Sequence, residues 1–227
     1  MLRKITILLS LILTLGFAVT TSAAAQDTPS VDSLNVDGLE SGYGRAYMPD
    51  LNALVEAMST PGAATPDLNA DGPSAIQISI LTFDKADNAK KASDSIADEI
   101  ASQEVEDVEM KSEEVKDLGD SATLYTGEVK SMGETMAITA LLVQDGEQLL
   151  QIQIVGGEND ANSSQAQAIA QHMLDTEPST NEVTFNEDGT STGGAFDRMP
   201  QSGDTDLIGD LTPFMDMDLS TTLESGS

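Results

Sequence analysis

The pattern of apolar and polar positions is clearest in the middle of the chain. Ile76, Ile78 and Ile80 alternate with polar residues, which predicts a half-buried strand that runs on to Phe83. Asp84 follows as an expected N-cap, and small or apolar residues then recur every three or four positions, which predicts an amphipathic helix of about five turns. The residues of this stripe are Ala86, Ala89, Ser93, Ile96, Ala97 and Ile100.

The residues after this helix predict short strands joined by turns. Val105, Val108 and Met110 indicate a strand, Leu118–Ser121 a turn, and 122–130 a further strand.

A hairpin follows, because residues 135–144 and 147–155 flank Asp145-Gly146, a pair expected to supply the two positive-φ positions of a type I′ turn. The last predicted element is a helix that starts at a capping box of Asn162 and Gln165 and ends at Pro178. Its inward residues are expected to be Ala166, Ile169, Ala170 and Met173.

This order of elements, β-α-β-β-β-β-α, predicts an α+β fold. We expect a two-layer sandwich, in which a mainly antiparallel sheet of four to five strands carries two helices on one face. Its polar face would present Gln77, Ser79, Gln151 and Gln153, either to solvent or to a glycan.

The remaining segments differ from this block in composition. Residues 1–25 read as a signal peptide, with Arg3 and Lys4 before an apolar run and Ala23 and Ala25 at a cleavage spacing; an uncleaved anchor is the alternative. We expect residues 26–74 to be a linker with a short helix around 50–59, 75–177 to be the α+β domain, and 178–227 to be an acidic, largely irregular tail. The mature protein would then be soluble and secreted, with no membrane insertion.

Charge and cysteine usage exclude several functions. The chain has 39 acidic and 10 basic residues, a net charge of −29, and no Cys. Such a charge disfavours nucleic acids and anionic membrane surfaces as partners, and without Cys neither disulfides nor thiol chemistry is available.

Catalytic motifs are weak. His172 is the single His, and we interpret it as a solvated helix residue because no Gly-x-Ser-x-Gly motif accompanies it. Many acidic residues leave a carboxylate-pair hydrolase as a third hypothesis for the function.

One spacing resembles half of a calcium loop. Asp67, Asn69 and Asp71 precede Gly72 as D-x-N-x-D-G, which places oxygen ligands at alternate positions. Position 12 of the loop would be Ile78, where a bidentate Glu is required. The alternatives are a calcium site completed by a distant acid and a Pro/Gly/Asp linker with chance spacing.

Two further groups are candidates for binding. Arg45 lies between Tyr43 and Tyr47 and could hold an anionic ligand, or serve as a salt-bridge partner in so acidic a chain. The tail alternates acidic and apolar residues, and it could dock a partner, fold back on its own domain or stay disordered. The apolar residues concerned are Leu211, Phe214, Met215, Met217 and Leu219.

The strand to Phe83-Asp84, the Ala-rich helix, Leu118-Gly119-Asp120-Ser121-Ala122 and the Asp-Gly hairpin together resemble exported bacterial lipoprotein or sensor-type α+β domains of unknown function. That resemblance implies a non-enzymatic role. We expect no cofactor, unless the Asp67, Asn69 and Asp71 loop binds calcium. The leading hypothesis is an exported, non-enzymatic binding or sensor-like domain whose partner is an unknown protein or small ligand outside the cytoplasm. The alternative is a calcium-stabilised surface module.

Overall fold

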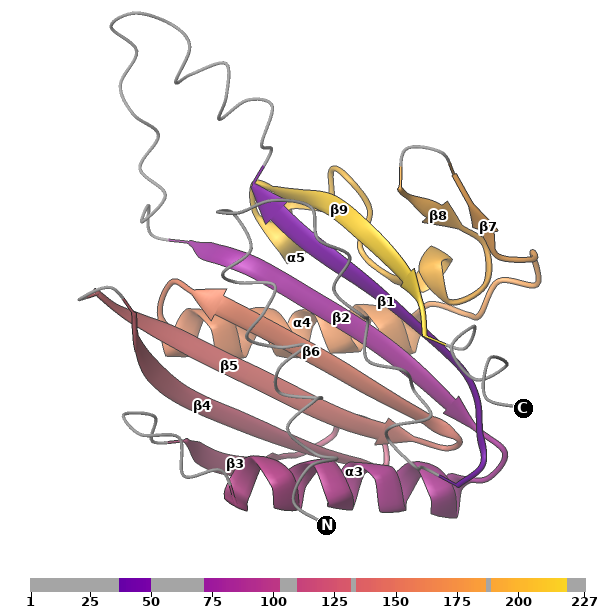
Figure 1. Cartoon of the computed structure of the whole chain (residues 1–227), viewed down its shortest axis with the longest axis horizontal. Helices are drawn as coiled ribbons and strands as arrows, with labels where there is room; N and C mark the ends of the chain where they lie inside the picture. The colour runs from indigo at the N-terminus through magenta and orange to yellow at the C-terminus, as the bar shows by residue number, and fades with distance from the viewer. Residues whose placement is uncertain (1–36, 50–71, 103–109, 132–133, 187–188, 220–227) are drawn as a thin grey trace, which may run out of the picture.

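The computed structural model describes residues 37–49, 72–102, 110–131, 134–186 and 189–219, and these are dominated by one antiparallel sheet (Figure 1). Seven strands pair in the order β3-β4-β5-β6-β2-β1-β9. Their bounds are β1 (Leu39–Pro49), β2 (Pro73–Phe83), β3 (Lys111–Val115), β4 (Ser121–Ser131), β5 (Glu134–Asp145), β6 (Gln148–Gly156) and β9 (Leu211–Asp218). The other elements are α3 (Ala86–Ser102), α4 (Asn159–Asp175), α5 (Thr205–Ile208), the 3-10 helix η2 (Gly194–Arg198) and the small hairpin β7 (Thr184–Phe185) and β8 (Ser191–Thr192).

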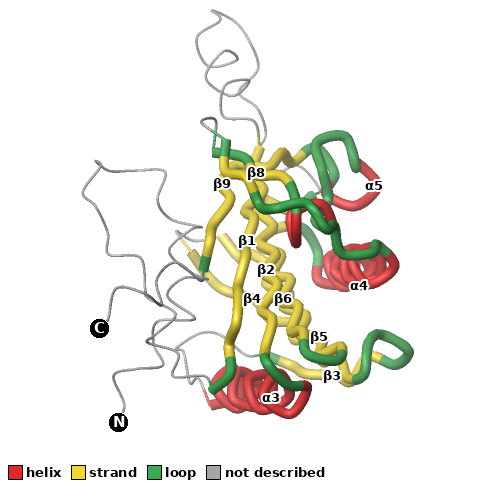
Figure 2. Tube along the Cα trace, turned by 90° about the vertical axis from the view of Figure 1, so that its right-hand side faces the viewer, coloured by secondary structure: helices red, strands yellow, loops and turns green. Residues whose placement is uncertain are grey.

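The predicted two-layer sandwich is wrong. The sheet has seven strands rather than four or five, and α3 and α4 pack on opposite faces of it. Ile169 and Met173 of α4 belong to the same buried cluster as Ile78 and Ile152, whereas Ala89 of α3 packs in a different cluster. Figure 2 shows the two helices on different sides of the strands.

The apolar residues of the central strands explain why both faces are covered. Leu81 and Phe83 of β2 pack with α3, although Ile80 points to the α4 side. Similarly, Leu149 and Leu150 are adjacent in β6 and lie in different clusters. Because successive side chains of a strand point to opposite faces, adjacent buried leucines require cover on both sides.

Several individual elements are confirmed, with changes at their ends. The predicted strand to Phe83, the long helix after it, the strand 122–130 and the hairpin are all present. The strand expected around Val105 and Met110 instead occupies Lys111–Val115, and Val105 and Val108 lie outside the described residues.

The hairpin turn differs from the expected type. Asp145 pairs with Gln148, so the two loop residues are Gly146 and Glu147. Gly146 has φ of 53° and Glu147 is not in the positive-φ region, which is the requirement of a type II′ rather than a type I′ turn. The glycine therefore takes the first central position of the turn and not the second.

The start of α4 also differs. Its N-cap is Glu158, and Asn162 lies inside the helix. Asn162 is buried and its side-chain amide donates to the carbonyl oxygen of Gly156 at 2.7 Å. The predicted inward residues of this helix, Ala166, Ile169, Ala170 and Met173, are each fully buried.

A second turn is fastened to this hairpin. The Asp120 carboxylate accepts a hydrogen bond from the backbone N–H of Gly146 at 2.9 Å, and its own N–H donates to the carbonyl of Gln144. Gly119 has φ of 61°, and a Cβ atom there would lie 2.8 Å from the Gln144 carbonyl oxygen. The Leu118-Gly119-Asp120 sequence thus joins the β3–β4 turn to the β5–β6 hairpin.

The segments expected as linker and tail both contribute strands. β1 lies within residues 26–74, and β9 pairs with it antiparallel, Arg45 opposite Asp216. Between α4 and β9, Phe196, Met199 and Ile208 join the core on the α4 side of the sheet, next to Tyr47 of β1. Residues 189–219 are therefore folded onto the sheet rather than irregular.

Candidate functional site

Four polar side chains lie together at the centre of the sheet. Gln77 of β2 stands directly opposite Gln153 of β6, and Ser79 stands opposite Gln151. They alternate with isoleucines that face α4, so all four point to the α3 side of the sheet. The three glutamines are half-buried and Ser79 is 7% exposed. We call these four residues the amide patch.

The row neighbours of Gln77 and Gln153 are uncharged. In the row that holds Gln77 and Gln153, the neighbours on β1 and β5 are Ala46 and Ala140. Toward α3 the face becomes apolar, with Leu81 and Leu149 under the helix. The patch therefore begins where the cover provided by α3 ends.

Two methionines of β9 border the patch on one side. Met215 pairs with Ala46 and is 39% exposed, and Met217 pairs with Gly44. A Cβ atom on Gly44 would lie 3.2 Å from the Met217 Cε and 3.4 Å from the Ser79 Oγ, which shows that the methionine lies across the glycine toward the serine. The edge strand thus provides an apolar rim for a polar surface.

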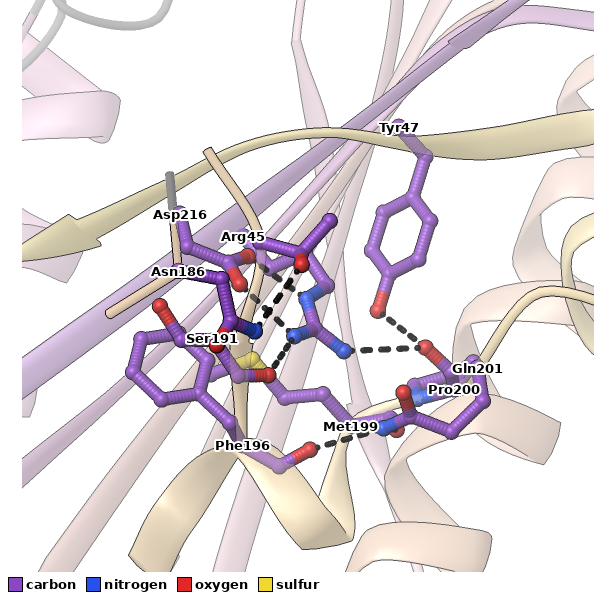
Figure 3. Close-up of polar contacts among 10 residues, drawn as sticks. Arg45, Tyr47, Asn186, Ser191, Phe196, Met199, Pro200, Gln201 and Asp216 are labelled. Atoms are coloured by element: carbon purple, nitrogen blue, oxygen red, sulfur yellow. Dashed lines mark hydrogen bonds and ion pairs between the residues drawn. The ribbon is translucent and has the colours of Figure 1, made fainter. Parts of the chain in front are cut away.

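Arg45 lies on the opposite face, at the junction of β1, β8, β9 and the segment after η2 (Figure 3). Its Nε and Nη2 donate to the two oxygens of Asp216 at 2.6 and 2.7 Å. Nη2 also donates to the Ser191 carbonyl at 2.8 Å, and Nη1 to the Pro200 carbonyl at 3.5 Å. Both side chains of the ion pair are 1% exposed.

Aromatic rings complete this cluster. The guanidinium carbon of Arg45 lies 5.2 Å from the centre of the Phe196 ring, within the range of a cation–π contact. Tyr43 and Phe185 both meet Phe196 edge-on, at 5.4 and 5.8 Å between ring centres. The Tyr47 hydroxyl donates to the Pro200 carbonyl at 2.9 Å.

The pKa values of Arg45 and Tyr47 reflect their burial and the charges of their neighbours. Burial alone would lower the pKa of Arg45, but its hydrogen bonds to Asp216 and the charge of that carboxylate raise the pKa above its ordinary value. Burial raises the pKa of the Tyr47 hydroxyl well above its ordinary range, against the opposing charge of Arg45. Arg45 therefore stays charged and Tyr47 stays neutral at any physiological pH.

Arg198 fixes the same C-terminal segment at a second point. It is 4% exposed, and its Nε donates to the Met173 carbonyl at 2.9 Å in the last turn of α4. Its Nη1 donates to the Gln148 side-chain oxygen at 2.7 Å. Burial lowers the pKa of Arg198, and the charge of Asp145 opposes that effect. A cation at a helix C-terminus is favoured by the helix dipole.

The other predicted site residues are placed as follows. Tyr43 is half-buried beside Phe196, and His172 is half-buried on α4. Asp67, Asn69 and Asp71 lie outside the described residues. In the part of the chain that the structure describes, no group of three or more His, Cys, Asp or Glu side chains is placed to hold a metal ion.

Of the alternatives for the tail, the structure shows the one in which it folds back. Leu211 is buried in the α4-side core, and Leu219 packs against the α3-side cluster. Phe214 and Met215 are 45% and 39% exposed. The pairing of β9 with β1 thus leaves part of the apolar set accessible.

Comparisons with known proteins add little. No family model matches the chain, and no curated protein matches it in sequence. Among solved structures, the extracellular domain of PknH from Mycobacterium tuberculosis is similar with a TM-score of 0.31 and 10% sequence identity, over 62% of this chain and 88% of that one. None of the helices in the described ranges is both long and apolar enough to cross a membrane.

Sequence reasoning found the residues of the amide patch but missed the role of Asp216. The alternation of Gln77, Ser79, Gln151 and Gln153 with isoleucine was sufficient to place the patch on one face. Arg45 and Asp216 are 171 positions apart, and neither periodicity nor spacing connects them. The one sequence feature that could have drawn attention to a buried arginine pair is the scarcity of arginine, since Arg45 and Arg198 are the only two arginines after position 3.

Proposed function

We propose that this chain is an exported, non-enzymatic binding domain and that the amide patch is its binding surface. The observation that carries the proposal is the half-buried pair Gln77 and Gln153 at the centre of the sheet, on the face that α3 covers in part. Export is inferred from Arg3, Lys4 and the apolar run after them.

The position of the buried charges supports a binding role without catalysis. Arg45 and Asp216 neutralise each other, and Arg198 donates to a backbone carbonyl and an amide. These groups hold the C-terminal segment on the sheet, and their hydrogen bonds lie within the chain. The amide patch, by contrast, belongs to rigid central strands, which are a suitable support for a preorganised binding surface.

A co-sedimentation experiment tests the proposal. The exported chain is purified from the medium of an expressing host and mixed with the insoluble envelope fraction of the organism that makes it. We expect the wild-type chain to sediment with the envelope and the variant Gln77→Ala with Gln153→Ala to remain in the supernatant. The control pair, Gln167→Ala with Gln171→Ala on α4, should sediment like the wild type. Equal sedimentation of all three proteins would contradict the proposal.

A further inference from the structure

The chemistry of the amide patch indicates which ligand it suits. Each glutamine amide offers N–H donors and a carbonyl acceptor, and the Ser79 hydroxyl does both as well. A surface of this kind matches a partner whose groups also donate and accept, above all a series of hydroxyl groups. Because Gln77 and Gln153 are directly opposite each other, their amides lie close enough to engage adjacent hydroxyls of one ring.

The charge of the chain restricts the class of ligand further. The chain carries a net charge of −29, which repels a polyanion over the whole surface. A polycation would need carboxylates at the contact, and the amide patch and its row neighbours Ala46 and Ala140 have none. The surface is therefore complementary to an uncharged ligand.

Shape favours an extended ligand. In the row Met215–Ala46–Gln77–Gln153–Ala140, Ala46 is buried at 3% exposed and Ala140 packs against the α3-side cluster of Ile100, Tyr125 and Leu142. The accessible side chains are therefore Met215, Gln77 and Gln153, which lie on a stretch of four adjacent strands that spans about 14 Å at about 4.8 Å per strand. Met215, 39% exposed at one end of the row, offers an apolar surface to the C–H groups of a sugar ring.

We propose that the amide patch binds a neutral polysaccharide laid across the strands from Met215 to Gln153. This inference rests on the proposed function and names the ligand class of the same surface. The glutamines supply the hydrogen bonds, and Met215 and Met217 of β9 supply the apolar contact.

Side-chain amide signals in nitrogen-15 NMR spectra of the exported chain test the inference directly. The probes are neutral oligomers of glucose and of mannose, anionic oligomers of galacturonate and cationic oligomers of glucosamine. We expect at least one neutral oligomer to shift the side-chain N–H₂ signals of Gln77, Gln151 and Gln153 and to leave that of Gln171 unchanged. The variant Gln77→Ala with Gln153→Ala should raise the dissociation constant about tenfold or more, since two hydrogen bonds are lost, and Gln171→Ala should leave it as it is.

Two results would overturn the inference. One is a shift of the patch signals with galacturonate or glucosamine oligomers alone, and the other is no shift with any neutral oligomer. If either occurs while the envelope co-sedimentation still depends on Gln77 and Gln153, the ligand class is wrong and the binding surface stands. If the co-sedimentation is also independent of these residues, the proposed function fails with it.

Discussion

Arg45 and Asp216 form a bidentate ion pair that joins β1 to β9, with nitrogen–oxygen distances of 2.6 and 2.7 Å and both side chains 1% exposed. The pair stands opposite in the register of the two strands. It therefore fixes which residues of the edge strand face the amide patch, because Met215 and Met217 alternate with Asp216.

Removing one partner of this pair should be more costly than removing both. Arg45→Met leaves the Asp216 carboxylate buried without its cation, and Asp216→Leu leaves the guanidinium without its anion, so each should lower the free energy of unfolding by about 3–5 kcal/mol. The double variant should lose less than either single variant, because neither charge is then left buried without its partner. Urea unfolding followed by circular dichroism measures all three, and strictly additive losses would show that the two side chains are not coupled.

The raised pKa of Tyr47 predicts that the protein loses stability at alkaline pH. Its hydroxyl pKa is raised in the folded state, whereas an unfolded tyrosine releases its proton near pH 10. Above that pH the unfolded chain binds fewer protons than the folded chain, so the free energy of unfolding falls as the pH rises.

Tyr47→Phe removes this effect and the hydrogen bond to Pro200. We expect the variant to be less stable at pH 8 by about 1 kcal/mol. Between pH 10 and 11 the wild type should lose about 1 kcal/mol more than the variant does. Urea unfolding at each pH gives both values, and parallel pH profiles would rule out a raised pKa at this residue.

Gly119 and Gly146 form a matched pair for a backbone test. Both have positive φ, but a Cβ on Gly119 would meet the Gln144 carbonyl oxygen at 2.8 Å, whereas one on Gly146 would meet no atom within 4 Å. Gly146→Ala should cost about 1 kcal/mol, the price of the left-handed conformation alone. Gly119→Ala should lower the stability clearly more than Gly146→Ala does. Thermal unfolding of the two variants measures both losses. Equal losses of stability would mean that the turn can move away from the hairpin.

Replacing Arg198 should destabilise the end of α4 locally. Arg198→Met removes the hydrogen bonds to Met173 and Gln148, and charged hydrogen bonds of this kind are worth about 1.5–3 kcal/mol. Hydrogen exchange should accelerate at the Thr176 amide, which donates to the His172 carbonyl in the wild type. Arg198→Lys keeps the charge but lacks the planar guanidinium group that reaches two acceptors. It should therefore restore part of the protection from exchange. Unchanged exchange in both variants would show that Arg198 does not stabilise the end of α4.

The sequence predicted elements better than their arrangement. The strand that contains Ile78 and the helix that contains Ile169 follow from local periodicity, because burial on one face repeats every two or about 3.6 residues. Periodicity does not specify the face of the sheet on which a helix lies. Leu149-Leu150 was the neglected signal, since two adjacent buried residues in a strand need cover on both faces.

The edge of the sheet was harder to predict than its centre. β9 reads as an acidic stretch because Asp216 and Asp218 alternate with Met215 and Met217. Its place beside β1 depends on a buried charge pair between distant residues, which local sequence patterns do not encode. The amide patch was visible from the sequence as a polar strand face, but its apolar rim depends on that edge pairing.

The central claim is that ligand contacts the sheet through the amide patch, and site-specific photo-crosslinking tests it most directly. A benzophenone amino acid replaces Met215 at the rim of the amide patch in one variant and Gln171 in another, so that all four residues of the patch are kept, and each exported protein is irradiated with the envelope fraction of its organism. Our account predicts covalent adducts through position 215 and none through position 171. Adducts through 171 alone, or with equal yield at both positions, would contradict it.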